Sequence, residues 1–143
     1  MQFTMNMNTL LLALGVASTA LAAPTTKSTR QADSWTITSL SRTCDDADTT
    51  CTWTFGIDNG VDNTPCTFDT TGSPASQADG GPATCGVYTV TSSWSGQYGE
   101  DNGFTTLAVV DYDAGLLVWP GYSDADLAGG EVVADQTYTP SPV

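Results

Sequence analysis

The chain has 143 residues, with 3 basic side chains against 16 acidic ones, 4 cysteines and no histidine. The absence of histidine excludes Ser–His and Cys–His nucleophile pairs and removes the commonest neutral zinc ligand. A formal net charge of −13 repels phosphate backbones and anionic lipids, so nucleic acid and membrane surfaces are poor partners. The sequence also lacks a Gly-rich phosphate-binding motif with a lysine, which disfavours a nucleotide-dependent enzyme.

Residues 1–22 are expected to be a signal peptide. An apolar run at 10–17 is followed by Ala-Leu-Ala at 20–22, the small-x-small form of a signal-peptidase site. The run is too short to span a membrane, and the last residues lack the apolar tail of a lipid-anchor signal. We therefore expect a secreted, extracellular protein without membrane insertion, in which a flexible segment at 23–33 precedes one domain at 34–143.

The four cysteines predict two disulfides, because an even number in a secreted chain of this size is typical of disulfide pairing. Three connectivities are possible. Pairing of nearest neighbours is favoured, since it closes the shortest loops. A metal site is the competing interpretation, but the sequence has no C-x-x-C pair and the expected compartment is oxidising. The favoured pairs are Cys44–Cys51 and Cys66–Cys85.

The hydrophobic pattern after residue 34 repeats every two residues, which is typical of strands with one buried face. In residues 51–57 the large apolar groups occupy odd positions, and threonine or glycine occupies even ones. Residues 34–43 follow the same alternation. The polar segment 45–50 joins the two runs, so the sequence predicts a hairpin with Cys44 and Cys51 at the base of its loop.

Several short strands follow, separated by turn residues. Residues 71–84 are rich in Gly, Ser, Pro and Asp and are expected to form a long surface loop. Residues 124–128 are compatible with one helical turn. The pattern predicts an all-β protein, a single compact antiparallel β-barrel or sandwich of seven to eight short strands. The later strands are expected at 66–69, 87–92, 104–110, 116–119 and 131–138.

The aromatic side chains divide into two groups. Four of them are in strand phase with aliphatic residues and are predicted to pack in the core. Three tyrosines lie beside turns, where exposure would let them stack on sugar rings. The predicted core residues are Trp35, Trp53, Phe55 and Trp119, and the turn tyrosines are Tyr98, Tyr112 and Tyr122. Arg42, the only basic residue after position 34, is predicted to pair with a neighbouring carboxylate.

The acidic residues raise two further hypotheses, calcium binding and glycoside hydrolysis. Asp124, Asp126 and Glu131 resemble the start of a calcium loop, because two carboxylates stand two residues apart and Gly occupies the sixth position. The loop lacks a ligand at its fifth position, so solvated turn carboxylates are the favoured interpretation and no cofactor is expected. Glycoside hydrolysis needs a facing pair of carboxylates. Glu100 and Glu131, the two glutamates, lie in no recognisable motif, so a non-enzyme is expected.

Several segments of the chain follow a shared pattern: residues 34–45, Cys51-Thr52-Trp53-Thr54-Phe55-Gly56-Ile57-Asp58, residues 65–68 and 85–90, Asp101-Asn102-Gly103-Phe104-Thr105-Thr106, and residues 117–124. These segments resemble small secreted fungal proteins described as hypersensitive-response-inducing elicitors. The resemblance implies a compact antiparallel β-barrel with two disulfides, similar to the Alternaria major-allergen-like fold. It also implies release around host plant cells, where relatives provoke defence signalling and local cell death. No catalytic residues carry over from it.

Two functional hypotheses follow. The first is a non-enzymatic secreted elicitor or effector whose partner is a plant host component at the cell surface or in the apoplast. The alternative is a secreted protein that binds or hydrolyses cell-wall carbohydrate. For the first, the contact surface is predicted on the 71–84 loop and the strand after it, at Thr71, Asp79, Tyr88 and Ser92. Mutual repulsion among the acidic side chains favours a monomer.

Overall fold

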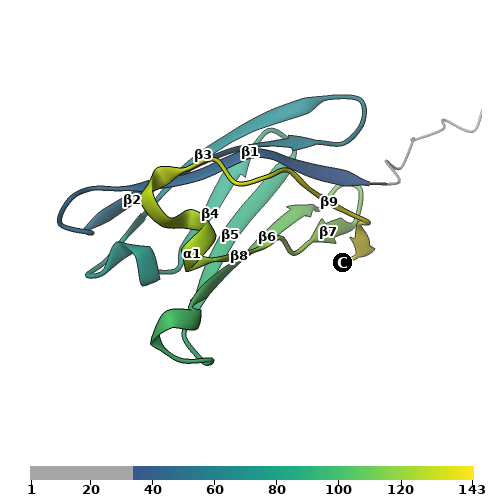
Figure 1. Ribbon diagram of the computed structural model, residues 1–143. Helices are drawn as coiled ribbons and strands as arrows, with labels where there is room; N and C mark the ends of the chain where they lie inside the picture. Colours follow the sequence, from purple (N-terminus) through teal and green to yellow (C-terminus); the bar gives the residue numbers. More distant parts are fainter. Residues whose placement is uncertain (1–33) are drawn as a thin grey trace, which may run out of the picture.

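The structure is a computed structural model and describes residues 34–143. The predicted signal peptide at 1–22 and the segment at 23–33 lie outside the described residues. Two antiparallel sheets face each other (Figure 1). The first has the strand order β3-β2-β1-β9. Its strands are β1 (Trp35–Cys44), β2 (Thr50–Asp58), β3 (Asn63–Thr71) and β9 (Gln136–Tyr138).

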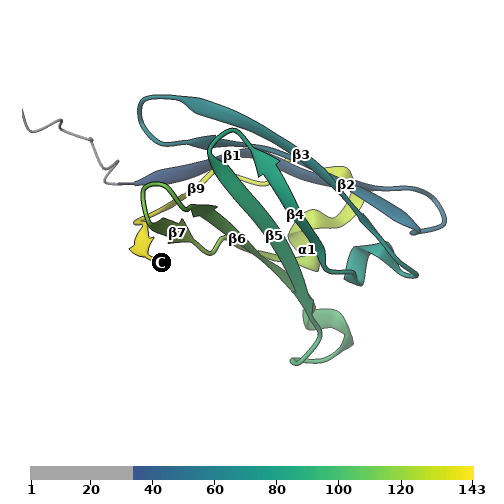
Figure 2. The ribbon, with the colours of Figure 1, turned by 180° about the vertical axis from the view of Figure 1, so that it is seen from behind.

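The second sheet has the order β10-β7-β6-β5-β4, and β8 pairs with β6 beside that path. Figure 2 shows β4, β5 and β6 of this sheet from behind. The all-β prediction is confirmed, and the sheets form a sandwich-like arrangement rather than a closed barrel. The strands are β4 (Gly80–Cys85), β5 (Tyr88–Ser95), β6 (Phe104–Asp111), β7 (Leu116–Val118), β8 (Gly121–Ser123) and β10 (Ser141–Pro142).

Four short helical segments occupy the connections between strands. The predicted helical turn is confirmed by α1, in which the Ser123 hydroxyl caps the first turn by accepting from the Asp126 amide. None of the helical segments between residues 34 and 143 is long and apolar enough to cross a membrane. The segments are η1 (Ala75–Gln77), η2 (Glu100–Asn102), α1 (Asp124–Leu127) and η3 (Ala128–Gly130).

The core lies between the sheets and follows the two-residue alternation. In β2 the odd positions from Cys51 to Ile57 are buried, as predicted. Trp53 stacks on Phe68 of the neighbouring strand, with ring centroids 6.0 Å apart. Trp35 meets Tyr88 of the opposite sheet edge-on at 5.1 Å. Such aromatic pairs contribute roughly 0.5–1.5 kcal/mol beyond the area they bury. The Trp53–Phe68 pair strengthens the first sheet, and the Trp35–Tyr88 pair joins the two sheets.

Both favoured disulfides are confirmed. Cys44 and Cys51 stand opposite each other in the β1–β2 register and close the hairpin loop. Cys66 of β3 is bonded to Cys85 of β4. Because β3 belongs to the first sheet and β4 to the second, this bond joins the two layers at one edge of the sandwich.

The predicted loop at 71–84 is wrong in part, because β4 begins at Gly80. Its first residues, Gly-Gly-Pro, show no hydrophobic alternation. A Cβ on Gly80 would lie 2.4 Å from a Thr70 methyl and 2.9 Å from the Ser92 hydroxyl. A side chain at position 80 would therefore collide with both neighbours. The strand can pass here only without a side chain, which removes the sequence signal that would have identified it.

The predicted last strand at 131–138 is shorter than expected, with β9 confined to Gln136–Tyr138. The β1 register shifts between Thr38 and Ser41, where Ser39 has a φ of 51°. Across this bulge, the Asp135 carboxylate accepts from the Ser39 amide at 2.9 Å. The bulge interrupts the regular ladder, so the pairing of β9 with β1 is limited to residues 136–138. Beyond the bulge, the Val133 amide still donates to the Leu40 carbonyl at 2.7 Å.

Candidate interaction surface

Four connecting segments meet at one end of the sandwich, which we call the loop end. They join β1 to β2, β3 to β4 and β5 to β6, and the fourth contains α1 and η3. In Figures 1 and 2 they lie on the side away from the C-terminus. The loop end is defined as residues 45–49, 72–79, 96–103 and 124–130. The polar contacts described next join these segments across both sheets.

The β1–β2 loop is ordered by its own first carboxylate. Asp45 accepts a 2.5 Å hydrogen bond from the Thr49 hydroxyl and a 2.6 Å bond from the Thr49 amide. These bonds hold the pKa of the exposed Asp45 carboxyl below its ordinary value of 3.8, because they stabilise its charged form. The Cys44–Cys51 disulfide closes the loop beneath them.

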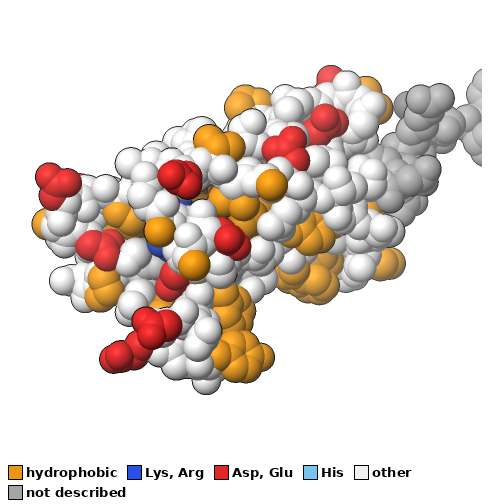
Figure 3. Space-filling model, viewed as in Figure 1, with side chains coloured by type: hydrophobic (Ala, Val, Ile, Leu, Met, Phe, Trp, Pro, Cys, Tyr) orange, Lys and Arg blue, Asp and Glu red, His pale blue; other side chains and the backbone are white. Residues whose placement is uncertain are grey.

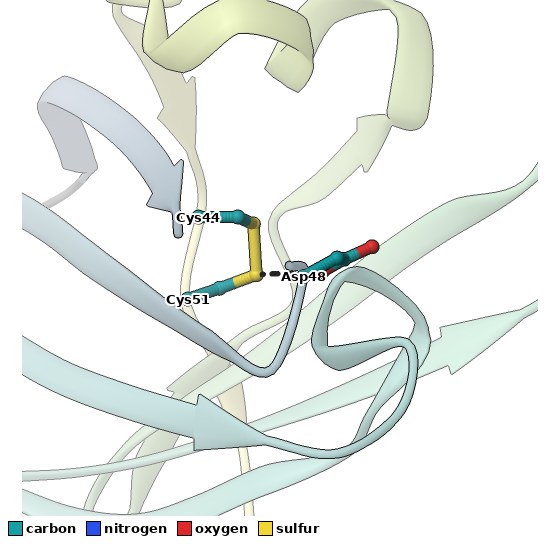
Figure 4. Close-up of side chains that lie close together, drawn as sticks. All are labelled: Cys44, Asp48 and Cys51. Atoms are coloured by element: carbon teal, nitrogen blue, oxygen red, sulfur yellow. Dashed lines mark hydrogen bonds between the residues drawn. A yellow bond between two sulfur atoms is a disulfide. The ribbon is translucent and has the colours of Figure 1, made fainter. Parts of the chain in front are cut away.

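Asp48 connects this loop to the β3–β4 connection. Its backbone carbonyl accepts from the Ala75 amide at 2.7 Å, and its carboxylate accepts from the Ser76 amide at 2.8 Å and from the Ser76 hydroxyl. Asp48 Oδ1 also lies 3.5 Å from Cys51 Sγ (Figure 4). Asp48 thus fastens η1 onto the disulfide-closed hairpin.

Arg42 is buried at the centre of the loop end, with 6% of its surface exposed. Its Nη1 donates to the Ser76 carbonyl at 3.0 Å and lies 3.6 Å from Asp124 Oδ1. Its guanidinium carbon stands 5.6 Å from the centroid of the Trp53 ring, a cation–π arrangement. The predicted ion pair is confirmed, but its partner is Asp124 of α1 rather than a neighbour in the sequence.

Asp124 also connects α1 to the β5–β6 hairpin. Its Oδ2 accepts from Trp94 Nε1 at 2.9 Å, and its amide donates to the Gly103 carbonyl at 2.9 Å. The Trp94 amide in turn donates to Asp79 at 2.9 Å. Asp124 therefore contacts both ends of the 96–103 loop, because its carboxylate bonds to Trp94 and its backbone amide to Gly103. The Asp79 carboxylate binds the Trp94 backbone from the β3–β4 side.

Gly103 fits into this junction only because it has no side chain. A Cβ there would lie 2.3 Å from Asp124 Oδ2 and 3.0 Å from the Trp94 ring. Gly103→Ala is expected to lower the free energy of unfolding by about 2 kcal/mol through overpacking and loss of the Trp94–Asp124 bond. Urea unfolding measures this loss. The matched control is Gly121→Ala, which meets open space and should change stability by less than about 0.5 kcal/mol; equal losses would contradict the explanation.

The predicted contact residues do not share one surface. Thr71 and Asp79 are exposed. Tyr88 and Ser92 are only 1% and 4% exposed, so their placement on a contact surface is wrong. Tyr88, Val90 and Ser92 occupy every second position of β5, so their side chains lie together on its inner face. The spacing of two residues between Tyr88 and Val90 is the sequence signal that places Tyr88 and Ser92 on the buried face of the strand.

The three calcium candidates are divided among different environments. Asp124 is engaged by Arg42 and Trp94. Asp126 and Glu131 line a shallow depression of about 450 Å³ together with Asp135. Between residues 34 and 143, the only group of ligand atoms within 4.8 Å of one another belongs to Cys44, Asp48 and Cys51. The two sulfurs of that group are bonded to each other, so it offers no thiolate to a metal.

The aromatic predictions are confirmed except at two positions. Trp35, Trp53 and Phe55 are buried, whereas Trp119 is 58% exposed because β7 ends one residue before it. Tyr98 and Tyr112 are exposed as predicted, at 68% and 65%. Tyr122 is 2% exposed, so its predicted exposure is wrong. It lies in β8, which is too short to show an alternating pattern.

The buried Tyr122 predicts an alkaline instability. Its hydroxyl has no hydrogen-bond partner among the described residues, and burial, then Tyr138 and Asp135, raise its pKa above the ordinary 10.0. Neutral Tyr122 therefore contributes stability that is present below pH 10 and lost as pH rises further. Tyr122→Phe should make stability fall less steeply above pH 10 and leave neutral-pH stability unchanged or higher. Urea unfolding from pH 7 to 11 tests this; an unchanged alkaline slope would contradict it.

Comparison with known proteins identifies the relatives of this chain. A family model described as Effector TSP1 matches residues 36–143. A protein named Effector TSP1 from Hypocrea virens (strain Gv29-8 / FGSC 10586) is 52% identical over an alignment of 139 residues, and the match covers 93% of this chain and 95% of that protein. The matches confirm the expected class of fungal effector. The relation to the Alternaria allergen-like barrel stays a prediction.

Proposed function

Because the chain belongs to the Effector TSP1 family, we propose that it is a secreted, non-enzymatic effector that contacts a plant host component outside the cell. In this proposal the residues before position 23 are a signal peptide, and recognition in the plant leads to defence responses such as hypersensitive cell death. The loop end makes the contact.

The proposal rests on one observation: polar contacts between side chains hold the segments of the loop end in one arrangement. Asp48 and Arg42 both bond to Ser76, and Asp124 bonds to Trp94 and pairs with Arg42. These groups hold loops from both sheets in one arrangement, as expected where binding loops stand on a rigid scaffold. With no histidine in the chain, the geometry supports a fixed contact surface better than a catalytic centre.

Leaf infiltration tests this function. Purified oxidised protein is compared with a reduced and alkylated sample, and cell death and the oxidative burst are recorded in several plant species. The oxidised protein alone should be active, because Cys44–Cys51 closes the β1–β2 loop of the loop end and Cys66–Cys85 joins the two sheets that support it. Equal activity from both samples would instead indicate a linear peptide signal. Silence from both would contradict the proposal.

The alternative function, binding of cell-wall carbohydrate, has one supporting observation. Tyr98, Tyr112 and Trp119 are each more than half exposed, and exposed aromatic rings stack on sugars. Pull-down on insoluble glucan and chitin separates the two functions: retention on the polymer, lost on alanine substitution of these rings, would favour the carbohydrate hypothesis. Hydrolysis has less support, because the depression lined by Asp126, Glu131 and Asp135 contains no aromatic ring on which a sugar could stack.

A further inference from the structure

The β5–β6 connection projects from the sandwich (Figures 1 and 2). It carries the exposed ring of Tyr98, which lies against Phe104, the partly buried first residue of β6. Tyr98 is 68% exposed, and its ring stacks on Phe104 with centroids 5.8 Å apart and planes at 27°. Figure 3 shows hydrophobic side chains beside acidic ones at this projection. Tyr98 lies outside the hydrophobic core cluster, so the fold gives no reason for this ring at the tip.

The loop is held in one conformation by its own hydrogen bonds. The Gly99 amide donates to the Gly96 carbonyl at 3.1 Å, and the Asn102 amide donates to the Gly99 carbonyl at 3.1 Å. The Asn102 side chain donates to the Tyr98 carbonyl at 3.2 Å. Gly99 has a φ of 101°, a conformation that favours glycine. An ordered loop presents its rings at low entropic cost on binding.

The charge around the aromatic pair has one sign. Glu100 and Asp101 are exposed on the same loop, and Asp126 is exposed on the neighbouring helix α1. Arg42 is the only basic residue from 34 to 143 and is buried. The described surface therefore offers carboxylates and aromatic rings to a partner, but no exposed basic side chain.

We propose that the pair formed by Tyr98 and Phe104, flanked by Glu100 and Asp101, binds a lysine- or arginine-rich segment of a host protein. Aromatic faces attract ammonium and guanidinium groups, and the two carboxylates add complementary charge. Because one face of the Tyr98 ring stacks on Phe104, the exposed ring offers its outer face, which suits a single cationic side chain. This inference rests on the proposed function and names the chemistry of its partner.

The test uses the protein secreted from a yeast host and a fluorescent octalysine peptide. Anisotropy titration measures affinity, and ¹⁵N chemical-shift changes locate the contact. The proposal expects shifts concentrated in residues 96–104. Tyr98→Ala should weaken affinity about fivefold, while Tyr98→Phe keeps the ring and should stay within about twofold. Melting temperatures should match the wild type, because the Tyr98 ring is exposed.

The chain provides a matched control in Tyr112, which is 65% exposed and lies between Asp111 and Asp113. Tyr112→Ala should leave the affinity unchanged. An equal loss from both alanine variants, or shifts spread over all acidic surfaces, would overturn the proposal by indicating non-specific attraction. Binding of a glucosamine oligomer at residues 96–104 without binding of octalysine would also overturn it, in favour of a carbohydrate partner. Neither result depends on a leaf response, so failure of the proposed function remains distinguishable.

Discussion

Replacing Arg42 by methionine is expected to lower the free energy of unfolding by about 2 kcal/mol. Methionine keeps an apolar stem against Trp53 but removes the donor to the Ser76 carbonyl and the positive charge 3.6 Å from Asp124. Asp124 Oδ1 is a buried atom without a hydrogen bond in the described part of the chain. Loss of its counter-charge therefore leaves a poorly solvated anion. The Asp124 side chain as a whole is 31% exposed, which keeps the loss below that of a fully buried pair.

Urea unfolding followed by tryptophan fluorescence measures this change. Asp126→Asn, an exposed substitution on the same helix, is the control and should change stability by less than about 0.5 kcal/mol. Adding Asp124→Asn to Arg42→Met should restore part of the loss, since the amide oxygen still accepts from Trp94 and no charge is left unpaired. A wild-type stability for Arg42→Met would show that the ion pair does not hold the loop end.

Removing the Cys66–Cys85 disulfide is expected to cost about 3 kcal/mol, because it closes a loop with a sequence separation of 19. The bond joins β3 of one sheet to β4 of the other. The double substitution of both cysteines by alanine should therefore loosen the sheet edge and the β3–β4 connection, including the contacts of Ser76. Hydrogen exchange should show lost protection in residues 72–85.

The companion variant removes Cys44 and Cys51, whose sequence separation is 7. It should cost about 2 kcal/mol, because β1 and β2 remain paired through their ladder hydrogen bonds. Its lost protection should be confined to the β1–β2 hairpin near residues 44–51. The same loss of protection at residues 72–85 in both variants would contradict the separate roles assigned to the two disulfides.

The parts of the fold that follow from local sequence could be predicted. The β1–β2 hairpin depends on alternation and a polar loop, and nearest-neighbour cysteine pairing depends on short loop closure. β4 could not be predicted, because packing against Thr70 and Ser92 requires glycine at position 80, and glycine gives no hydrophobic alternation. The prediction that placed Tyr88 on the contact surface was wrong, although its spacing of two residues from Val90 indicated a buried side chain.

The polar core of the loop end could not be predicted from sequence. Arg42 lies beside Asp45 and Asp46 in the chain, yet it pairs with Asp124. That choice depends on how α1 lies against β1 after both sheets have formed. The same holds for the Trp94–Asp124 bond. Sequence identifies a charged side chain, but only tertiary packing decides which carboxylate reaches a buried guanidinium.

The most direct test of the account compares two matched variants by leaf infiltration. One replaces exposed loop-end residues by alanine, and the other replaces residues at the opposite end of the strands. Each removes two carboxylates, one exposed tyrosine and one further side chain, and both should keep the wild-type melting temperature. The loop-end set is Asp46, Gln77, Tyr98 and Asp101, and the opposite set is Val61, Asp62, Tyr112 and Asp113.

The account predicts that the loop-end variant loses the oxidative burst and cell death, while the opposite-end variant keeps both. Full activity of the loop-end variant, with loss from the opposite-end variant, would contradict the assignment of the contact surface.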